Sequence, residues 1–271
     1  MKEIVFNTGE TNKELRVHYN PEGSLLRRAQ MRMLDMLLYI DEVCKLQGIE
    51  YSLEGGNVLG AVRHGGFIPW DDDVDIIMRR KEYNRFIKYV AVHPHSQYRL
   101  QSFQTDKGYM GTWVVLRDTK SEYVKDDIVH NIRKYRGLQV DIFPIEDGYL
   151  KLVHKIAGNI HYWNNKFFVG KHNFTARCYW RIEQYCCFPI LRFFLSLFGD
   201  KKFFTYELGH GHYPKFPVES TFPLSTIDFE GHLFPAPNNT DMYLTAIYKE
   251  YMSLPPKDKR NRHMAKLKIW D

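Results

Sequence analysis

Residues 53–76 read LEGGNVLGAVRHGGFIPWDDDVDI, and the end of this block predicts a strand over residues 73–78. Successive side chains of a strand point to opposite faces, so Asp73 and Asp75 would project together while the apolar residues beside them enter the core. Four aspartates in five positions repel one another unless a cation neutralises them. Two carboxylates about 7 Å apart along a strand can hold one hard cation or bridge two. The block therefore predicts a strand that carries a metal site.

A glycine pair, Gly55-Gly56, precedes a short helix that we expect over residues 58–63. Glycine allows the backbone to turn tightly or to approach a ligand closely. If a helix begins at Asn57, its unpaired amides can hold a phosphate group. Arg63 would either add a fixed positive charge to a diphosphate or form an ion pair with a neighbouring acid, and the sequence leaves both roles open.

Another carboxylate, Asp141, lies in an apolar run that predicts a strand over residues 137–143. A buried carboxylate without a partner is costly. We therefore expect this strand to lie beside Asp73 and Asp75, so that the three carboxylates form one site. Magnesium suits a few carboxylates that leave room for water and phosphate oxygens.

Two other interpretations of the acidic run are weaker. A calcium-binding loop beginning at Asp71 would require glycine at its sixth position, where this sequence has Ile76. A solvated acidic turn without metal would explain Asp71 and Asp72, but it would leave Asp75 and Asp141 unexplained inside apolar runs.

The elements around these motifs alternate between helix and strand. Apolar spacing predicts helices over residues 24–48 and 80–92, the first ending at Gly48. Further strands are expected over residues 49–53, 97–104, 112–118 and 122–125. This alternation predicts an α+β fold with a sheet flanked by helices.

Composition excludes several classes of protein. With 44% hydrophobic and 15% aromatic residues, the 271-residue chain can bury a large core, which excludes a disordered or fibrous protein. The net charge of +6 does not by itself indicate a nucleic-acid partner, and we expect none. Four cysteines are too few for a disulfide scaffold and favour a reducing compartment. No apolar run reaches the ~20 residues needed to span a bilayer, and no signal peptide is evident.

Residues 151–202 differ from the rest of the chain because they carry nine Lys or Arg residues against two acids. The segment is rich in aromatic residues and is expected to be helical. Such a segment fits a surface that meets anionic lipid or a phosphate-bearing polymer. A pair of solvated basic helices packed on the core would explain it equally well.

The block at 53–76, the run Val140-Asp141-Ile142-Phe143-Pro144 and the later Phe229-Glu230-Gly231 closely resemble the motifs of the LicD family. That family comprises bacterial phosphocholine transferases related to the fukutin group of sugar-modifying enzymes. The resemblance covers roughly residues 24–144 and 216–264, and residues 150–210 do not share it.

This resemblance implies a nucleotidyltransferase-like mixed β-sheet flanked by helices, with an added helical basic-aromatic segment. It divides the chain into a catalytic core at residues 1–149, the basic-aromatic segment at 150–215 and a C-terminal segment at 216–271 that packs back on the core. Its implied metal ligands are Asp73, Asp75 and Asp141, which would bind Mg²⁺ or Mn²⁺, and Asp141 would also receive the acceptor proton. The implied substrate-binding residues are Gly55, Gly56, Asn57, Arg63 and Trp70.

The implied reaction transfers phosphocholine from CDP-choline to a hydroxyl of a cell-surface glycopolymer, such as teichoic acid or lipopolysaccharide, and releases CMP. An aromatic cage would recognise the quaternary ammonium group, with candidates Trp70, Tyr109, Trp113, Tyr123 and Tyr135. A same-fold transferase that uses CDP-ribitol or CDP-glycerol, a nucleotidyltransferase that uses an NTP, and a binding module without catalysis are the alternatives. A nucleotide donor implies a cytoplasmic enzyme, with residues 151–202 as a possible contact to the inner face of the membrane and a lipid-linked glycan as acceptor.

Overall fold

A computed structural model describes residues 5–124, 128–168, 174–260 and 266–270. Its centre is a mixed, twisted sheet of seven strands within these residues, in which five follow the order β1-β2-β6-β4-β3. They are β1 (Ser52–Leu53), β2 (Asp75–Arg79), β6 (Gln139–Tyr149), β4 (Val114–Asp118) and β3 (Tyr98–Gln101). Only β2 and β6 run parallel among these neighbours, and their register places Asp75 beside Asp141.

The long strand β6 connects two parts of the sheet. Its first half pairs with β4, and its second half pairs antiparallel with β7 (Asp200–Tyr206), which continues to β8 (Phe216–Pro217). The strand expected over 137–143 thus extends to Tyr149. The structure also corrects the expectation of a wholly helical segment at 150–215, because residues 200–206 form a strand of the central sheet.

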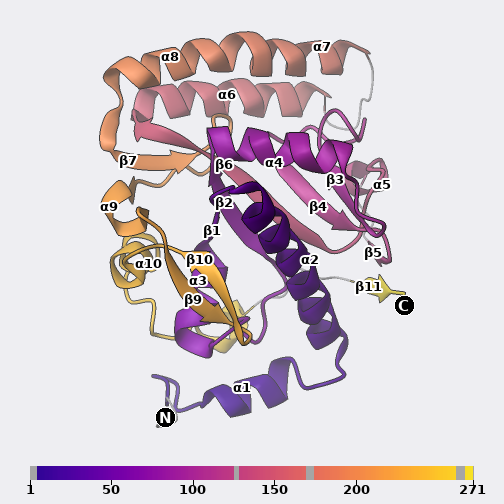
Figure 1. The fold of residues 1–271 in the computed structure, drawn as a ribbon, viewed down its shortest axis with the longest axis vertical. Coiled ribbons are helices and arrows are strands. Elements are labelled where there is room, and N and C mark those ends of the chain that lie inside the picture. The colour runs from indigo at the N-terminus through magenta and orange to yellow at the C-terminus, as the bar shows by residue number, and fades with distance from the viewer. Residues whose placement is uncertain (1–4, 125–127, 169–173, 261–265, 271) are drawn as a thin grey trace.

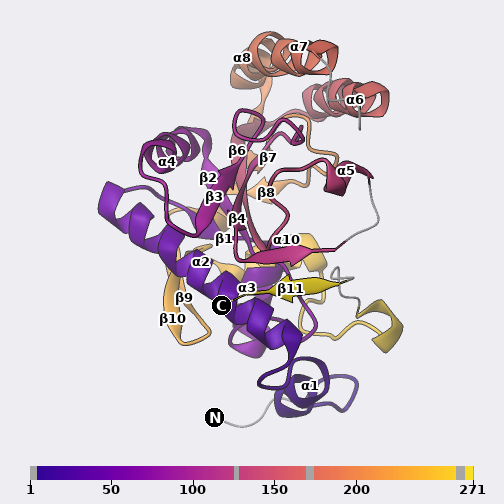
Figure 2. The ribbon, with the colours of Figure 1, turned by 90° about the vertical axis from the view of Figure 1, so that its right-hand side faces the viewer.

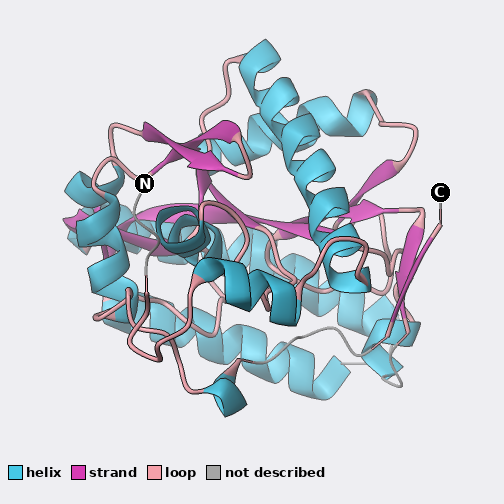
Figure 3. Ribbon diagram, turned by 90° about the horizontal axis from the view of Figure 1, so that it is seen from below, coloured by secondary structure: helices cyan, strands magenta, loops and turns pink. Residues whose placement is uncertain are grey.

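Helices cover both faces of the sheet, which Figure 3 shows nearly edge-on. On one side lie α2 (Leu25–Gln47) and α4 (Arg80–Val92), as Figure 2 shows. The Ser24 hydroxyl accepts the Arg27 amide at the start of α2, and Gly48 ends that helix with a left-handed φ of 57°. The predicted helices 24–48 and 80–92 are therefore confirmed.

A separate layer of helices crosses one end of the sheet (Figure 1). It comprises α6 (Lys151–Phe168), α7 (Phe174–Ile182), one π-helical turn (Glu183–Cys187) and α8 (Phe188–Phe198). Val153, Phe188, Leu195 and Leu208 belong to a small second core beneath it. Every helix within the described residues is too short or too polar to span a lipid bilayer.

The remaining elements surround the start of β2 and the outer edge of the sheet. They are α1 (Asn12–Tyr19), α3 (Gly55–His64), β5 (Ser121–Tyr123), α5 (Ile128–Asn131), α9 (Val218–Thr221), the hairpin β9 (Ser225–Phe229) and β10 (His232–Ala236), α10 (Thr240–Tyr248), a 3₁₀ turn (Lys257–Lys259) and β11 (Leu267–Ile269). The latter strand pairs with β5. The observed mixed sheet flanked by helices agrees with the predicted α+β class, whereas the division into units at 149 and 215 remains a prediction.

Candidate active site

Helix α3 begins at the glycine pair, three residues earlier than predicted. Gly55 has a φ of 45°, and its N–H donates to the Tyr243 hydroxyl at 3.4 Å. A Cβ added at Gly56 would lie 3.2 Å from a carboxylate oxygen of Asp71. The second glycine therefore lets the first turn of α3 approach the acidic run closely.

Asn57 ties this helix to the backbone of the acidic run. Its side-chain oxygen accepts the Asp75 N–H at 2.7 Å, and its side-chain nitrogen donates to the Asp73 carbonyl at 3.4 Å. Both polar atoms of Asn57 have partners within the chain. Asn57, which was expected to bind substrate, therefore holds the backbone in position at the start of β2.

Strand β2 begins at Asp75, so the expectation that Asp73 lies within the strand is wrong. Asp73 belongs to the extended segment that leads into β2. The structure also excludes the calcium-loop interpretation. Residues 71–82 would have to form one ligand-binding loop, but β2 and the start of α4 occupy most of them.

Asp75 and Asp141 lie side by side on adjacent parallel strands; Asp141 is buried and Asp75 is half-buried. Burial raises the pKa of Asp75 well above its usual range, and the charges of Asp141, Glu54 and Asp73 raise it further. Burial also raises the pKa of Asp141, although the Trp113 indole N–H donates to it at 2.7 Å and Gln139 donates to its other oxygen.

Asp71, Asp72 and Asp73 form a second acidic group, in which one oxygen from each carboxylate lies within 4.8 Å of the others. Asp72 is only 1% exposed, so a solvated acidic turn does not describe it. Burial raises the pKa of Asp71 to about 7, and the charges of Asp73 and Asp72 contribute. Sequence reasoning did not assign these first two aspartates a role.

Together these carboxylates offer the oxygen donors that a hard divalent cation prefers. Asp75 feels the negative charges of Asp141, Glu54, Asp73 and Asp71. The positive charges of Arg117 and Arg133 act on its partner Asp141. A cluster of this kind is costly unless the carboxylates are protonated or bind metal. The residues present therefore fit a magnesium or manganese site.

Arg63 lines a cavity of about 540 Å³ together with Gly56, Trp70 and Asp71. Its guanidinium donates to the carbonyls of Tyr251 and Ser253 at 2.8 and 3.2 Å, so the C-terminal segment packs back against α3. Burial lowers the pKa of Arg63 to about 10. Its hydrogen bonds to carbonyls fix its position, and its charge acts on Asp71.

The five aromatic residues that are candidates for a choline cage are not brought together in either of the described cavities that Trp70 and Trp113 line. Trp70 lines the cavity beside Arg63, and the Arg260 guanidinium lies 5.0 Å from its ring centroid. Trp113 lines a different cavity, Tyr109 and Tyr123 are buried, and Lys134 lies 4.9 Å from the ring centroid of Tyr135.

Two further groups at the site were missed by sequence reasoning. Glu54, at the start of α3, is buried and accepts hydrogen bonds from the hydroxyls of Tyr206 and Tyr243. His210 pairs with the buried Glu207 at 3.1 Å and stacks on Tyr206 with ring centroids 4.7 Å apart. Glu54 precedes the glycine pair directly, which was an available signal, whereas the region of His210 offered no motif.

Comparison with known proteins defines the class of this chain. It belongs to the family described as LicD/FKTN/FKRP, nucleotidyltransferase domain, which matches residues 48–192. The match continues through α6 and α7 into α8, so the expectation that residues 150–210 lie outside the resemblance is wrong for most of that segment.

Individual relatives are similar over different lengths. Identity to the lipopolysaccharide cholinephosphotransferase LicD of Haemophilus influenzae is 27% over 256 residues, covering 88% of this chain and 95% of that protein. Identity to the human ribitol 5-phosphate transferase FKRP is 30% over 90 residues, covering 33% of this chain and 18% of that protein. The family match and these similarities together identify the chain as a phosphotransferase.

Proposed function

We propose that the protein transfers phosphocholine from CDP-choline to a hydroxyl of a cell-surface glycopolymer and releases CMP in a metal-dependent reaction. The observation that carries this proposal is the similarity to a lipopolysaccharide cholinephosphotransferase over 95% of that protein's length. The adjacent carboxylates of Asp75 on β2 and Asp141 on β6 support it, since phosphoryl transfer depends mainly on positioning and on neutralising charge.

In the proposed reaction the acceptor oxygen forms a bond to the choline-bearing phosphorus. The bond from that phosphorus to the bridging oxygen breaks, and its electron pair leaves with CMP. Asp141 receives the acceptor proton as the general base, since its carboxylate lies beside Asp75 at the proposed reaction centre. Trp113 and Gln139 orient its carboxylate for this transfer.

Bound Mg²⁺ or Mn²⁺ would supply Lewis-acid stabilisation of the phosphate oxygens. Asp73, Asp75 and Asp141 are the proposed ligands. Asp71 and Asp72 are close enough to Asp73 to complete the site. Asn57 would hold the backbone between Asp73 and Asp75 in position through its two hydrogen bonds.

The cavity of about 540 Å³ is the proposed donor site, because it is lined by Gly56, Arg63, Asp71 and Lys259. Arg63 and Lys259 provide positive charge for a diphosphate, and Gly56 allows close approach of the backbone. Trp70, Tyr248 and Tyr251 line the same cavity and are the aromatic residues that could contact the donor there.

A related donor is the second candidate. The similarity of part of the chain to a ribitol 5-phosphate transferase favours CDP-ribitol, and CDP-glycerol is chemically close to it. Neither carries the positive charge of choline, so neither requires an aromatic cage. Use of an NTP with release of pyrophosphate is the remaining alternative.

We also propose that the helical layer contacts an anionic membrane surface from the cytoplasmic side. A lipid-linked glycan in that membrane would be the acceptor. More than half of the large apolar side chains exposed in the described residues lie on α6 to α8, including Trp163, Phe167, Phe193 and Phe198. Exposed apolar surface beside basic residues is typical of helices that lie in a membrane interface. Lys171, which adds to the positive charge in the sequence, lies outside the described residues.

Thermal unfolding with CDP-choline, CDP-ribitol, CDP-glycerol or CTP, each with and without Mn²⁺, tests the donor. A ligand that binds only the folded state raises stability by about 2.7 kcal/mol at a hundredfold excess over Kd. We expect the largest metal-dependent rise in Tm with CDP-choline. Equal shifts with the three CDP compounds would show that choline is not recognised.

A further inference from the structure

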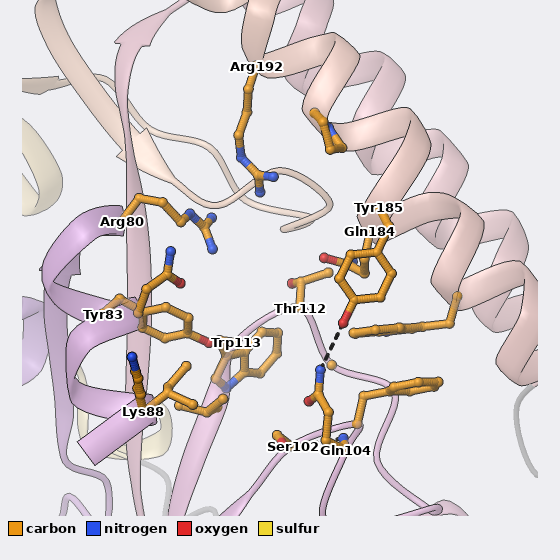
Figure 4. A pocket seen from close by; sticks show the side chains of 17 residues that line it. Arg80, Tyr83, Lys88, Ser102, Gln104, Thr112, Trp113, Gln184, Tyr185 and Arg192 are labelled. Carbon is orange, nitrogen blue, oxygen red and sulfur yellow. Dashed lines mark hydrogen bonds between the residues drawn. The ribbon is translucent and has the colours of Figure 1, made fainter. Parts of the chain in front are cut away.

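We propose that the cavity of about 490 Å³ between α4 and the helical layer binds the acceptor as a phosphorylated, and hence anionic, sugar; this rests on the proposed function. Figure 4 shows Arg80 and Arg192 entering this cavity from α4 and α8, with Trp113 at its floor and Tyr185 at its rim. The proposed donor cavity is lined by other residues, so the two substrates would occupy different sites.

Two consecutive residues connect the cavity to buried carboxylates, of which Asp141 is the proposed base. Trp113 lines the cavity and donates its indole N–H to Asp141 at 2.7 Å. Thr112 lines it too, and its hydroxyl donates to Glu207 at 2.7 Å, the carboxylate that pairs with His210. A ligand bound here would therefore lie against the residue that orients the proposed base.

The walls carry the groups that recognise a sugar ring. Tyr185 is the exposed aromatic ring of this wall, and it meets Trp180 edge-on at 6.3 Å. Trp180 and Phe103 are buried behind it and stack with centroids 3.7 Å apart. Aromatic faces contact the C–H surface of a sugar, while amides bind its hydroxyls. Gln104 and Gln184 provide such amides, and Gln104 donates to the Tyr185 hydroxyl at 3.1 Å.

The charge of the cavity indicates an anionic ligand. None of the described residues that line it is acidic, and three are basic, namely Arg80, Lys88 and Arg192. Both guanidiniums contact the single carboxylate of Glu146, at 2.5 and 2.9 Å, so one positive charge of the pair is not neutralised by it. The buried Nε of Arg80 has no hydrogen-bond partner among the described residues. A phosphate on the sugar would supply both a charge partner and an acceptor.

Calorimetric titration of the full-length protein with glucose 6-phosphate, glucose and inorganic phosphate tests this assignment. We expect glucose 6-phosphate to bind more tightly than either of the others. Lys88→Glu reverses one charge at the cavity and should weaken glucose 6-phosphate binding about tenfold. Lys81→Glu, on an exposed position of the same helix outside the cavity, is the matched control and should leave the affinity unchanged.

A second pair of variants tests the sugar-binding wall. Tyr185→Ala should weaken glucose 6-phosphate but not inorganic phosphate, whereas Tyr179→Ala, which alters an exposed tyrosine that lines a different groove, should change neither. Equal affinities in Lys88→Glu and Lys81→Glu, or displacement of glucose 6-phosphate by CDP-choline, would overturn the inference. Binding of CDP-choline to the wild-type protein, followed separately by thermal shift, tests the proposed function, so the two failures are distinguishable.

Discussion

Replacement of Asp75 by asparagine should abolish turnover and at the same time stabilise the metal-free protein. Asp75 lies beside Asp141 on parallel strands whose spacing is about 4.8 Å. Two ionised carboxylates at that separation repel by about 3.5 kcal/mol at an effective dielectric constant of about 20. The raised pKa values of both groups show that protonation relieves part of this repulsion. We therefore expect a net gain of about 1–2 kcal/mol in the free energy of unfolding, or about 2–6 °C in Tm.

The assay is thermal unfolding at pH 7.5 in EDTA and again with Mg²⁺ or Mn²⁺. Wild-type protein should be stabilised by metal, whereas Asp75→Asn should start from a higher Tm in EDTA and respond little to metal. Asp147→Asn is the matched control, because Asp147 is an exposed carboxylate on β6 paired with Arg79 at 3.9 Å, and surface pairs contribute little. A metal response in Asp75→Asn as large as in the wild type would refute the placement of the metal.

Three further predictions concern stability, positioning and the membrane surface. Burial tends to raise the pKa of Glu230, but the hydrogen bond and the charge of Arg27 on α2 lower it overall. Glu230→Gln should therefore lower the free energy of unfolding in urea by about 2 kcal/mol at pH 7. Because the folded-state pKa is lowered, this difference should be complete above the unfolded-state pKa of about 4.3 and disappear as the pH falls through the folded-state pKa. Asn57→Ala removes the acceptor of the Asp75 N–H and should lower kcat at least about tenfold, with partial recovery in Asn57→Asp, which keeps an acceptor oxygen. Phe193→Glu should reduce sedimentation with anionic liposomes, whereas Val17→Glu, equally exposed but on α1, should not; unchanged partition of both would contradict the membrane contact.

Local signals in the sequence were sufficient for α2 and α4. Ser24 and Gly48 mark the two ends of α2 because a hydroxyl cap and a left-handed glycine satisfy the backbone groups that a helix leaves unpaired. The pairing of β2 with β6 was also predictable, since two apolar runs each contain a carboxylate that is tolerable only if the two share a partner. The family motif made the same assignment independently.

Other features depend on tertiary contacts that no local pattern encodes. Asp73 alternates with Asp75 as strand residues do, but strand β2 starts only at Asp75, where pairing with β6 begins. The Asp75 N–H donates to the Asn57 side chain at this point. The strand β7 follows a helix without any family motif and brings Tyr206 to Glu54 from more than 150 residues away. The buried state of Asp72 likewise comes from the fold, because three consecutive aspartates alone indicate a turn.

The central claim is transfer of phosphocholine by the carboxylates on β2 and β6, and a label-transfer assay tests it most directly. CDP-choline labelled in the choline methyl groups would be incubated with Mg²⁺, wild-type protein or Asp75→Asn, and surface glycan prepared from cells that lack the protein. We expect label in the glycan and CMP to form in equal amounts with the wild type, and neither to form with Asp75→Asn. Label transfer by Asp75→Asn at the wild-type rate, or CMP release by the wild type with CDP-ribitol but not with CDP-choline, would contradict the account.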